Sequence, residues 1–122
     1  MAEDATYQDA CQSFLNRLDG EQKRLAVLET ALAVAEEGPV TAFLDLEFFA
    51  HRLRGAAAVF DLPELRDDSK VLELAAAKAV LRHAPINDPH VEAAIRLLKA
   101  QLTLVNGGMP SAADALALLP AN

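Results

Sequence analysis

The side chains best suited to chemistry lie in residues 48–61, FFAHRLRGAAAVFD. His51 offers an imidazole nucleophile on a segment with helical periodicity, and Arg54 follows it by about one turn. Gly55 comes next, although glycine in a helix interior is less stable than alanine by about 1 kcal/mol. An imidazole with a nearby cation and a side free of bulk suits a partner that must approach closely. Histidine, arginine and alanine are also ordinary on a solvated helix face, so this pattern by itself leaves both readings open.

At about 100° per residue, the helix around His51 has an apolar inward side and an unusual outward side. The inward stripe comprises Leu46, Phe49, Leu53, Ala56, Ala57 and Phe60. The outward neighbours of His51 are Leu44, Glu47, Phe48, Arg54, Gly55 and Ala58. A face that contacts only water is usually richer in lysine, glutamate and glutamine. Because exposed apolar side chains often mark association sites, we expect this outward side to bind a partner.

Helical periodicity fills most of the chain, and strand signals are nearly absent. A first stripe from Tyr7 to Leu18 is expected to end near Asp19 and Gly20. Four further helices are predicted at about 21–37, 40–60, 63–82 and 89–105. Amphipathic helices joined by short loops bury their stripes against one another. The prediction is therefore an all-α fold, an antiparallel up-down-up-down four-helix bundle with a short additional N-terminal helix and a short C-terminal segment.

Proline, glycine and aspartate mark the expected boundaries. Gly38 and Pro39 end the second helix, and Asp61 is expected to cap the N-terminus of the fourth, with Pro63 in its first turn. Residues 1–108 are predicted to form a single helical domain. Residues 109–122 are expected to be a tail or a short amphipathic capping helix that begins at Ser111.

Composition excludes several classes of function. The net charge of −7 argues against nucleic-acid binding and against anchoring on anionic lipid. No segment has the roughly 18 consecutive apolar residues of a membrane span, and the acidic N-terminus is not a signal peptide. We therefore expect a cytoplasmic protein. The single cysteine, Cys11, is expected to be a buried small hydrophobic residue in a reducing compartment.

The segment AHRLRGAA at residues 50–57 resembles the motif of the histidine-containing phosphotransfer (HPt) domain of bacterial phosphorelays. The resemblance extends over about residues 10–105. The next helix matches the family at the expected offsets from His51, with Leu65, Ser69, Leu72 and Glu73. Three positions depart from the family: Arg54 replaces the usual lysine, Ala56 a frequent serine, and Asp61 a usual glycine.

The resemblance implies that His51 accepts a phosphoryl group from an aspartate of a receiver domain, in a hybrid kinase or a response regulator, and passes it to a response-regulator aspartate. Glu73 matches a glutamate that orients the imidazole in some members. Arg54 would offset the phosphoryl charge, and Gly55 would leave room for docking. The resemblance also implies a monomer that binds no cofactor or metal, with Mg²⁺ on the receiver partner. Since the chain has no nucleotide-binding motif, it would carry phosphate without kinase activity of its own.

Two other readings stay open at this point. An HPt-like adaptor would dock on a kinase or receiver domain without being phosphorylated. A plain structural or dimerisation module would instead bury Leu44 and Phe48 in a subunit interface. The remaining histidines, His83 and His90, flank a proline-rich loop and are interpreted as surface loop residues.

Overall fold

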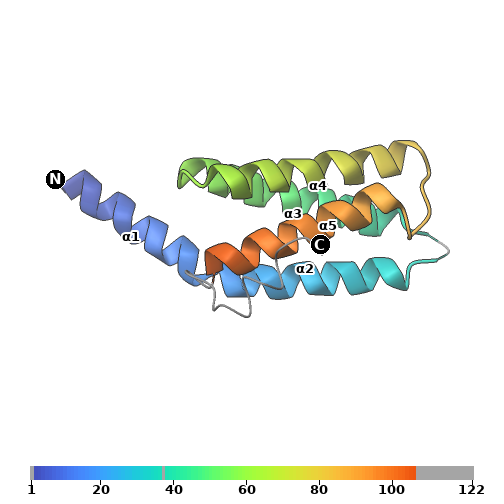
Figure 1. Cartoon of the computed structure of the whole chain (residues 1–122), viewed down its shortest axis with the longest axis horizontal. Helices are drawn as coiled ribbons and strands as arrows, with labels where there is room; N and C mark the ends of the chain where they lie inside the picture. Colours follow the sequence, from blue (N-terminus) through green and yellow to red (C-terminus); the bar gives the residue numbers. More distant parts are fainter. Residues whose placement is uncertain (1, 37, 107–122) are drawn as a thin grey trace, which may run out of the picture.

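A computed structural model describes residues 2–36 and 38–106, with side chains from residue 6 onward. Its described part contains five helices and no strand: α1 (Ala2–Asn16), α2 (Leu18–Ala33), α3 (Val40–Val59), α4 (Pro63–Leu81) and α5 (Pro89–Asn106). Helices α2 to α5 pack as a bundle in which each runs antiparallel to the one before it (Figure 1). The predicted all-α, up-down-up-down four-helix bundle is confirmed. None of the helices in the described ranges combines the length and apolarity that crossing a membrane requires.

The core is built from the apolar stripes that the sequence predicts. The inward stripe of α3 is buried at Leu46, Phe49, Leu53 and Ala57, and Ala56 and Phe60 are partly buried beside it. The predicted stripes of α4 and α5 are buried throughout; they are Leu65, Leu72, Ala76 and Ala79, and Val91, Ala94, Ile95, Leu98 and Leu102. Because α3 and α4 are both anchored in this core, their facing surfaces keep a fixed register.

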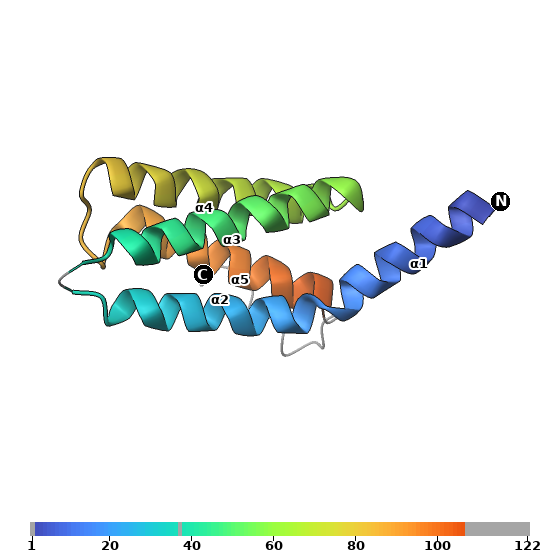
Figure 2. The ribbon, with the colours of Figure 1, turned by 180° about the vertical axis from the view of Figure 1, so that it is seen from behind.

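The junction between the first two helices lies at Arg17, so the break expected at Asp19 and Gly20 is wrong. The backbone N–H of Arg17 donates to the carbonyl of Phe14 (3.0 Å), which tightens the end of α1, and α1 then points away from the bundle (Figure 2). Asp19 lies in the first turn of α2, where the helix dipole favours an acidic side chain. Helix α2 also ends at Ala33, before the expected limit of 37.

The end of α3 explains why Asp61 stands where glycine is usual. Asp61 has a φ of 56°, in the left-handed region that glycine adopts most easily. The backbone N–H of Leu62 donates to the carbonyl of Ala57 (2.9 Å), the long hydrogen bond of a Schellman motif. Asp61 therefore ends α3 and does not cap α4, contrary to the expectation, whereas Pro63 does begin α4. Aspartate is among the few residues other than glycine that tolerate this conformation.

Helix α1 is attached to the bundle through aromatic contacts at the end of α3. The ring of Phe14 stacks on Phe60, with centroids 5.0 Å apart, and the hydroxyl of Tyr7 donates to the carbonyl of Val59 (3.1 Å). Cys11, on the same helix, is only half-buried, so the expectation of full burial is wrong. The tail helix expected to begin at Ser111 and the domain boundary at 108 lie outside the described residues.

Candidate functional site

His51 on α3 and Glu73 on α4 meet on the surface of the bundle. The Nδ1 atom of His51 lies 2.8 Å from Oε2 of Glu73. The side chain of His51 is 59% exposed, whereas that of Glu73 is only 16% exposed. The imidazole is thus accessible to a partner, while the carboxylate beneath it is held within the α3–α4 interface.

Arg54 neutralises the other oxygen of Glu73. Its Nε lies 3.1 Å from Oε1, as an ion pair, and this buried oxygen makes no well-oriented hydrogen bond. A largely buried carboxylate is costly unless cations or donors compensate its lost hydration. Arg54 therefore offsets part of the cost of burying this carboxylate beneath His51.

The pairing with Glu73 selects one tautomer of His51. An ionised carboxylate only accepts hydrogen bonds, so Nδ1 must carry the proton that it donates to Glu73. Nη2 of Arg54 also lies 3.3 Å from Nδ1, but a guanidinium cannot donate to a nitrogen that is already protonated. In the neutral ring, Nε2 therefore holds the free lone pair, on the far side of the imidazole from Glu73. This is the atom available for nucleophilic attack.

Two hollows flank His51 and contain the residues predicted to bind a partner. One, of about 620 Å³, is lined by Leu44, Asp45, Glu47, Phe48, His51 and Glu73. The other, of about 410 Å³, is lined by Arg54, Gly55, Ala58, Arg66, Asp67 and Lys70. The side chain of Phe48 is 63% exposed, as expected for a residue of the predicted apolar contact surface. The first hollow is acidic and apolar, and the second carries three cations.

Sequence reasoning missed Arg66 and Lys70 as neighbours of this site. A helical signal for them existed, because they precede Glu73 by seven and three residues, two turns and one turn of α4. Once Glu73 is placed beside His51, the same face of α4 must also carry Lys70 and Arg66. They were overlooked because only the residues on the helix of His51 were placed by angle.

Gly55 has no packing role against the residues that the structure describes. A Cβ atom built on it would meet no heavy atom within 4 Å. The bundle would therefore accept alanine there, and the glycine is not explained by the chain's own interior. A position without a side chain that packing does not require leaves room for another molecule to approach the helix closely.

The other two histidines lack comparable surroundings. His83 is exposed and ends α4 in a left-handed conformation, with φ of 54°. His90 is exposed in the first turn of α5, so it lies on a helix and not in the loop as expected. Neither imidazole forms a hydrogen bond or ion pair with another residue in the part of the chain that the structure describes. Among these residues, no three His, Cys, Asp or Glu side chains are grouped closely enough to hold a metal ion.

Fold and surface together define an all-helical bundle protein that presents a histidine on one helix, backed by a carboxylate from the next. Comparison with known families identifies the class, because the family model of the Hpt domain matches residues 9–118. The chain therefore belongs to the Hpt domain family, which has a phosphotransfer role in phosphorelay signalling. Comparison with curated proteins and with solved structures found no significant match.

Proposed function

We propose that His51 is the phosphoacceptor of this Hpt domain, and that its partners are the receiver domains of a hybrid histidine kinase and of a response regulator. The observation that carries the proposal is the 2.8 Å contact between Nδ1 of His51 and the carboxylate of Glu73. It leaves Nε2 as the nucleophile on an exposed ring. Geometry and family membership support the same residue independently.

The transfer balances without a co-reactant from this chain. The lone pair of Nε2 attacks the phosphorus of an aspartyl phosphate on the receiver, and the N–P bond forms as the P–O bond to aspartate breaks. The receiver's carboxylate leaves with the electron pair of that bond. The phosphorylated ring keeps its Nδ1 proton and gains positive charge, which the carboxylate of Glu73 stabilises. Transfer to a second receiver is the same step reversed.

Arg54 supplies the remaining electrostatic role. Its guanidinium lies beside the imidazole and pairs with Glu73 through Nε, which leaves other N–H donors for the phosphoryl oxygens. Arginine is well suited to this task because its planar fork binds phosphate with two parallel hydrogen bonds. The Mg²⁺ ion of the reaction comes with the receiver, and the chain contributes no cofactor of its own.

The two hollows beside His51 form the docking surface. Leu44, Glu47 and Phe48 provide contacts on one side, and the bare strip of Gly55 and Ala58 lets the receiver come close on the other. An in-line transfer needs the aspartate, the phosphorus and Nε2 nearly collinear, so the two backbones must approach closely. The protein acts as a monomer, because a dimer through Phe48 would cover the same surface.

The test is phosphoryl transfer from a phosphorylated receiver domain, with Mg²⁺, to the wild-type chain and to His51→Gln. Wild type should take up acid-labile, base-stable label, and His51→Gln should lose uptake by more than about a hundredfold. His90→Gln, the same change at another exposed helical histidine, should keep the wild-type rate. Normal uptake by His51→Gln would overturn the assignment. Absence of uptake by wild type across the receivers of the same cell, with binding retained, would favour a non-phosphorylated adaptor.

A further inference from the structure

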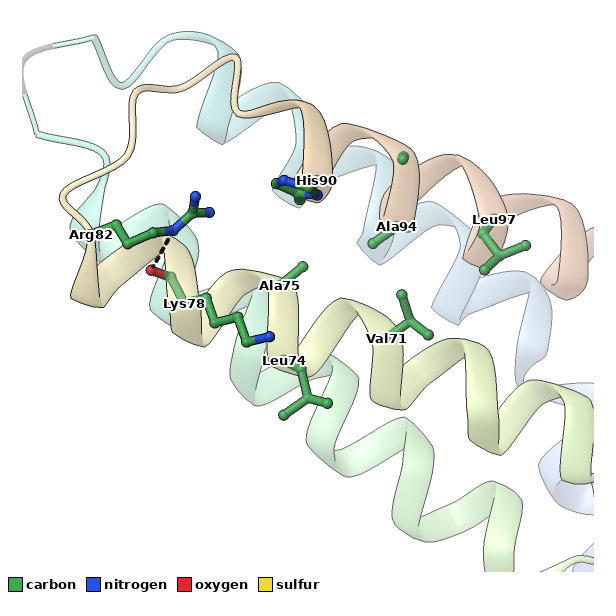
Figure 3. Close-up of a pocket in the computed structure, with 9 residues that line it drawn as sticks. Val71, Leu74, Ala75, Lys78, Arg82, His90, Ala94 and Leu97 are labelled. Atoms are coloured by element: carbon green, nitrogen blue, oxygen red, sulfur yellow. Dashed lines mark hydrogen bonds between the residues drawn. The ribbon is translucent and has the colours of Figure 1, made fainter.

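An open apolar groove runs between α4 and α5, lined by residues other than those of the two hollows beside His51 (Figure 3). It measures about 640 Å³, and its floor includes Val71, Leu74 and Leu97. These three side chains are 45%, 49% and 45% exposed, so nearly half of each faces solvent. One end of the groove is basic, where Lys78, Arg82 and His90 lie (Figure 3). A contiguous apolar surface of this kind usually has an occupant.

We propose that this groove is covered by the chain's own C-terminal segment, residues 111–119, folded back as a short helix. The segment reads SAADALALL and carries a single charged residue, Asp114. Its apolar residues recur at the spacing of one helical face, with Ala112, Ala115, Leu116 and Leu119 in the stripe. The Hpt match continues to residue 118, which makes most of this segment part of the domain.

The length of the chain beyond α5 fits the groove. Leu97 and His90 precede Asn106, the end of α5, by nine and sixteen residues, or about 13 and 24 Å along a helix. Residues 107–110, GGMP, span up to about 13 Å when extended. Residues 112–119 add about 12 Å as a helix. The two glycines ease the reversal of direction, so the stripe reaches from Leu97 towards His90.

Charge also favours this direction. A segment that runs back along α5 brings the C-terminal end of its helix to the basic end of the groove. The carbonyl groups at a helix C-terminus carry partial negative charge and are stabilised by cations. Lys78 lines the groove one turn before Arg82, its side chain extends along the groove towards Leu74 (Figure 3), and its ammonium group forms no ion pair with any described residue. The short tether further favours the segment over a separate copy of the chain, because it raises the effective concentration.

Amide hydrogen exchange on the full chain tests the proposal. Amides of residues 112–119 should exchange at least tenfold more slowly than in an unstructured peptide. Leu97→Asp in the groove should reduce this slowing of amide exchange to one-sixth or less of its wild-type value. Leu81→Asp is the matched control, since Leu81 is another exposed leucine, 80% exposed at the end of α4 and outside the groove, and it should leave the protection unchanged.

A second pair of variants lies in the segment itself and cannot unfold the bundle. Leu116→Asp, in the stripe, should remove the protection, whereas Ala117→Asp, on the opposite face of the same helix, should keep most of it. Exchange of the wild-type segment at the peptide rate, or equal loss in both variants of the segment, would overturn the proposal. So would a concentration-dependent dimer whose groove protection disappears on dilution, because a second copy would then be the occupant. Phosphoryl uptake by His51 should be unaffected in all four variants, so this proposal can fail without the phosphotransfer proposal.

Discussion

His51 and His90 are both exposed histidines on helices, yet their surroundings differ in every respect that phosphotransfer requires. His51 is held at Nδ1 by a carboxylate from the neighbouring helix, whereas His90 lies at a groove edge with Lys78 and Arg82. Asp88, two residues before His90, is already engaged by Arg82 (3.3 Å) and by the backbone N–H of Val91 (3.1 Å).

The residues that follow the two histidines differ in the same sense. Three and four positions after His51 come Arg54 and Gly55, a cation and a bare position. At the same spacing after His90 come Ala93 and Ala94, and Ala94 is buried in the core. Exposure alone therefore does not distinguish the two histidines. The carboxylate that fixes its tautomer and the open approach to its ring distinguish His51, and each can be removed separately.

Among changes to the surroundings of His51, the largest effect is expected from Glu73→Ala, which would leave His51 with no acid partner, as His90 is now. Without the acceptor at Nδ1, the ring is free to change tautomer and to rotate, and the charge of the phosphorylated ring loses its counterion. We expect the single-turnover rate of phosphoryl uptake to fall by at least about tenfold. Glu73→Gln keeps an acceptor oxygen and should lose less.

The matched control is Glu92→Ala, which removes an exposed glutamate two residues after His90 and should leave the rate unchanged. Nitrogen-15 chemical shifts of His51 would report the tautomer directly. An unchanged rate and unchanged shifts in Glu73→Ala would show that the carboxylate has only a structural role.

Gly55→Ala would make the position four residues after His51 the same as the one after His90. Since a Cβ atom at Gly55 meets nothing within 4 Å, urea unfolding should show a stability gain of about 0.5–1 kcal/mol. Transfer from the receiver should nevertheless slow by about threefold to tenfold, because the added methyl group lies where the partner approaches.

Gly20→Ala on α2 provides the comparison, because a Cβ atom there also meets nothing within 4 Å. This variant should gain stability with no change in transfer. If Gly55→Ala transfers at the wild-type rate, the bare position has no part in docking.

The sequence predicts some of these features and not others, because the signals differ in kind. The stripe positions of α3, α4 and α5 follow from apolar spacing alone, because burial imposes the helical period. The contact between His51 and Glu73 joins residues 22 apart, and it was expected only from the family resemblance. The break at Arg17 was expected slightly later, near Asp19 and Gly20, because no glycine or proline marks its true position. Asp61 was misplaced because aspartate serves both as a helix N-cap and in left-handed turns, and only the backbone distinguishes them.

The residues that end α3 and α4, Asp61 and His83, both have a left-handed backbone. His83 has a φ of 54°, a conformation that costs an L-residue about 1–2 kcal/mol relative to glycine. His83→Gly should therefore raise stability by about 0.5–1 kcal/mol in urea unfolding, after the greater freedom of unfolded glycine is counted. Asp61→Gly should gain less, because aspartate tolerates this conformation better. Phosphoryl uptake should stay at the wild-type rate in His83→Gly. A loss of uptake would show that His83 also contributes to the transfer.

The smallest effect concerns a carboxyl group on α4 that, unlike Glu73, faces no cation. Burial raises the pKa of Asp68 above its ordinary value of 3.8, with further repulsion from Asp67 and Glu64. With a raised pKa, the folded chain favours the protonated form, and that stabilisation is complete below pH 3.8 and lost as pH rises through the raised pKa. Asp68→Asn should therefore raise the Tm by a small amount at pH 7, and the gain should vanish near pH 3.

Asp45→Asn, at an exposed carboxyl on α3, is the control and should show no such pH-dependent gain. A gain of Asp68→Asn that persists at pH 3 would mean that packing, and not charge, limits stability at this position. A gain confined to neutral pH would show that a partly buried carboxylate on α4 is unfavourable when no cation faces it. Glu73 differs from Asp68 in its ion pair with Arg54 (3.1 Å), so the role proposed for His51 depends on a carboxylate whose counterion the fold holds in place.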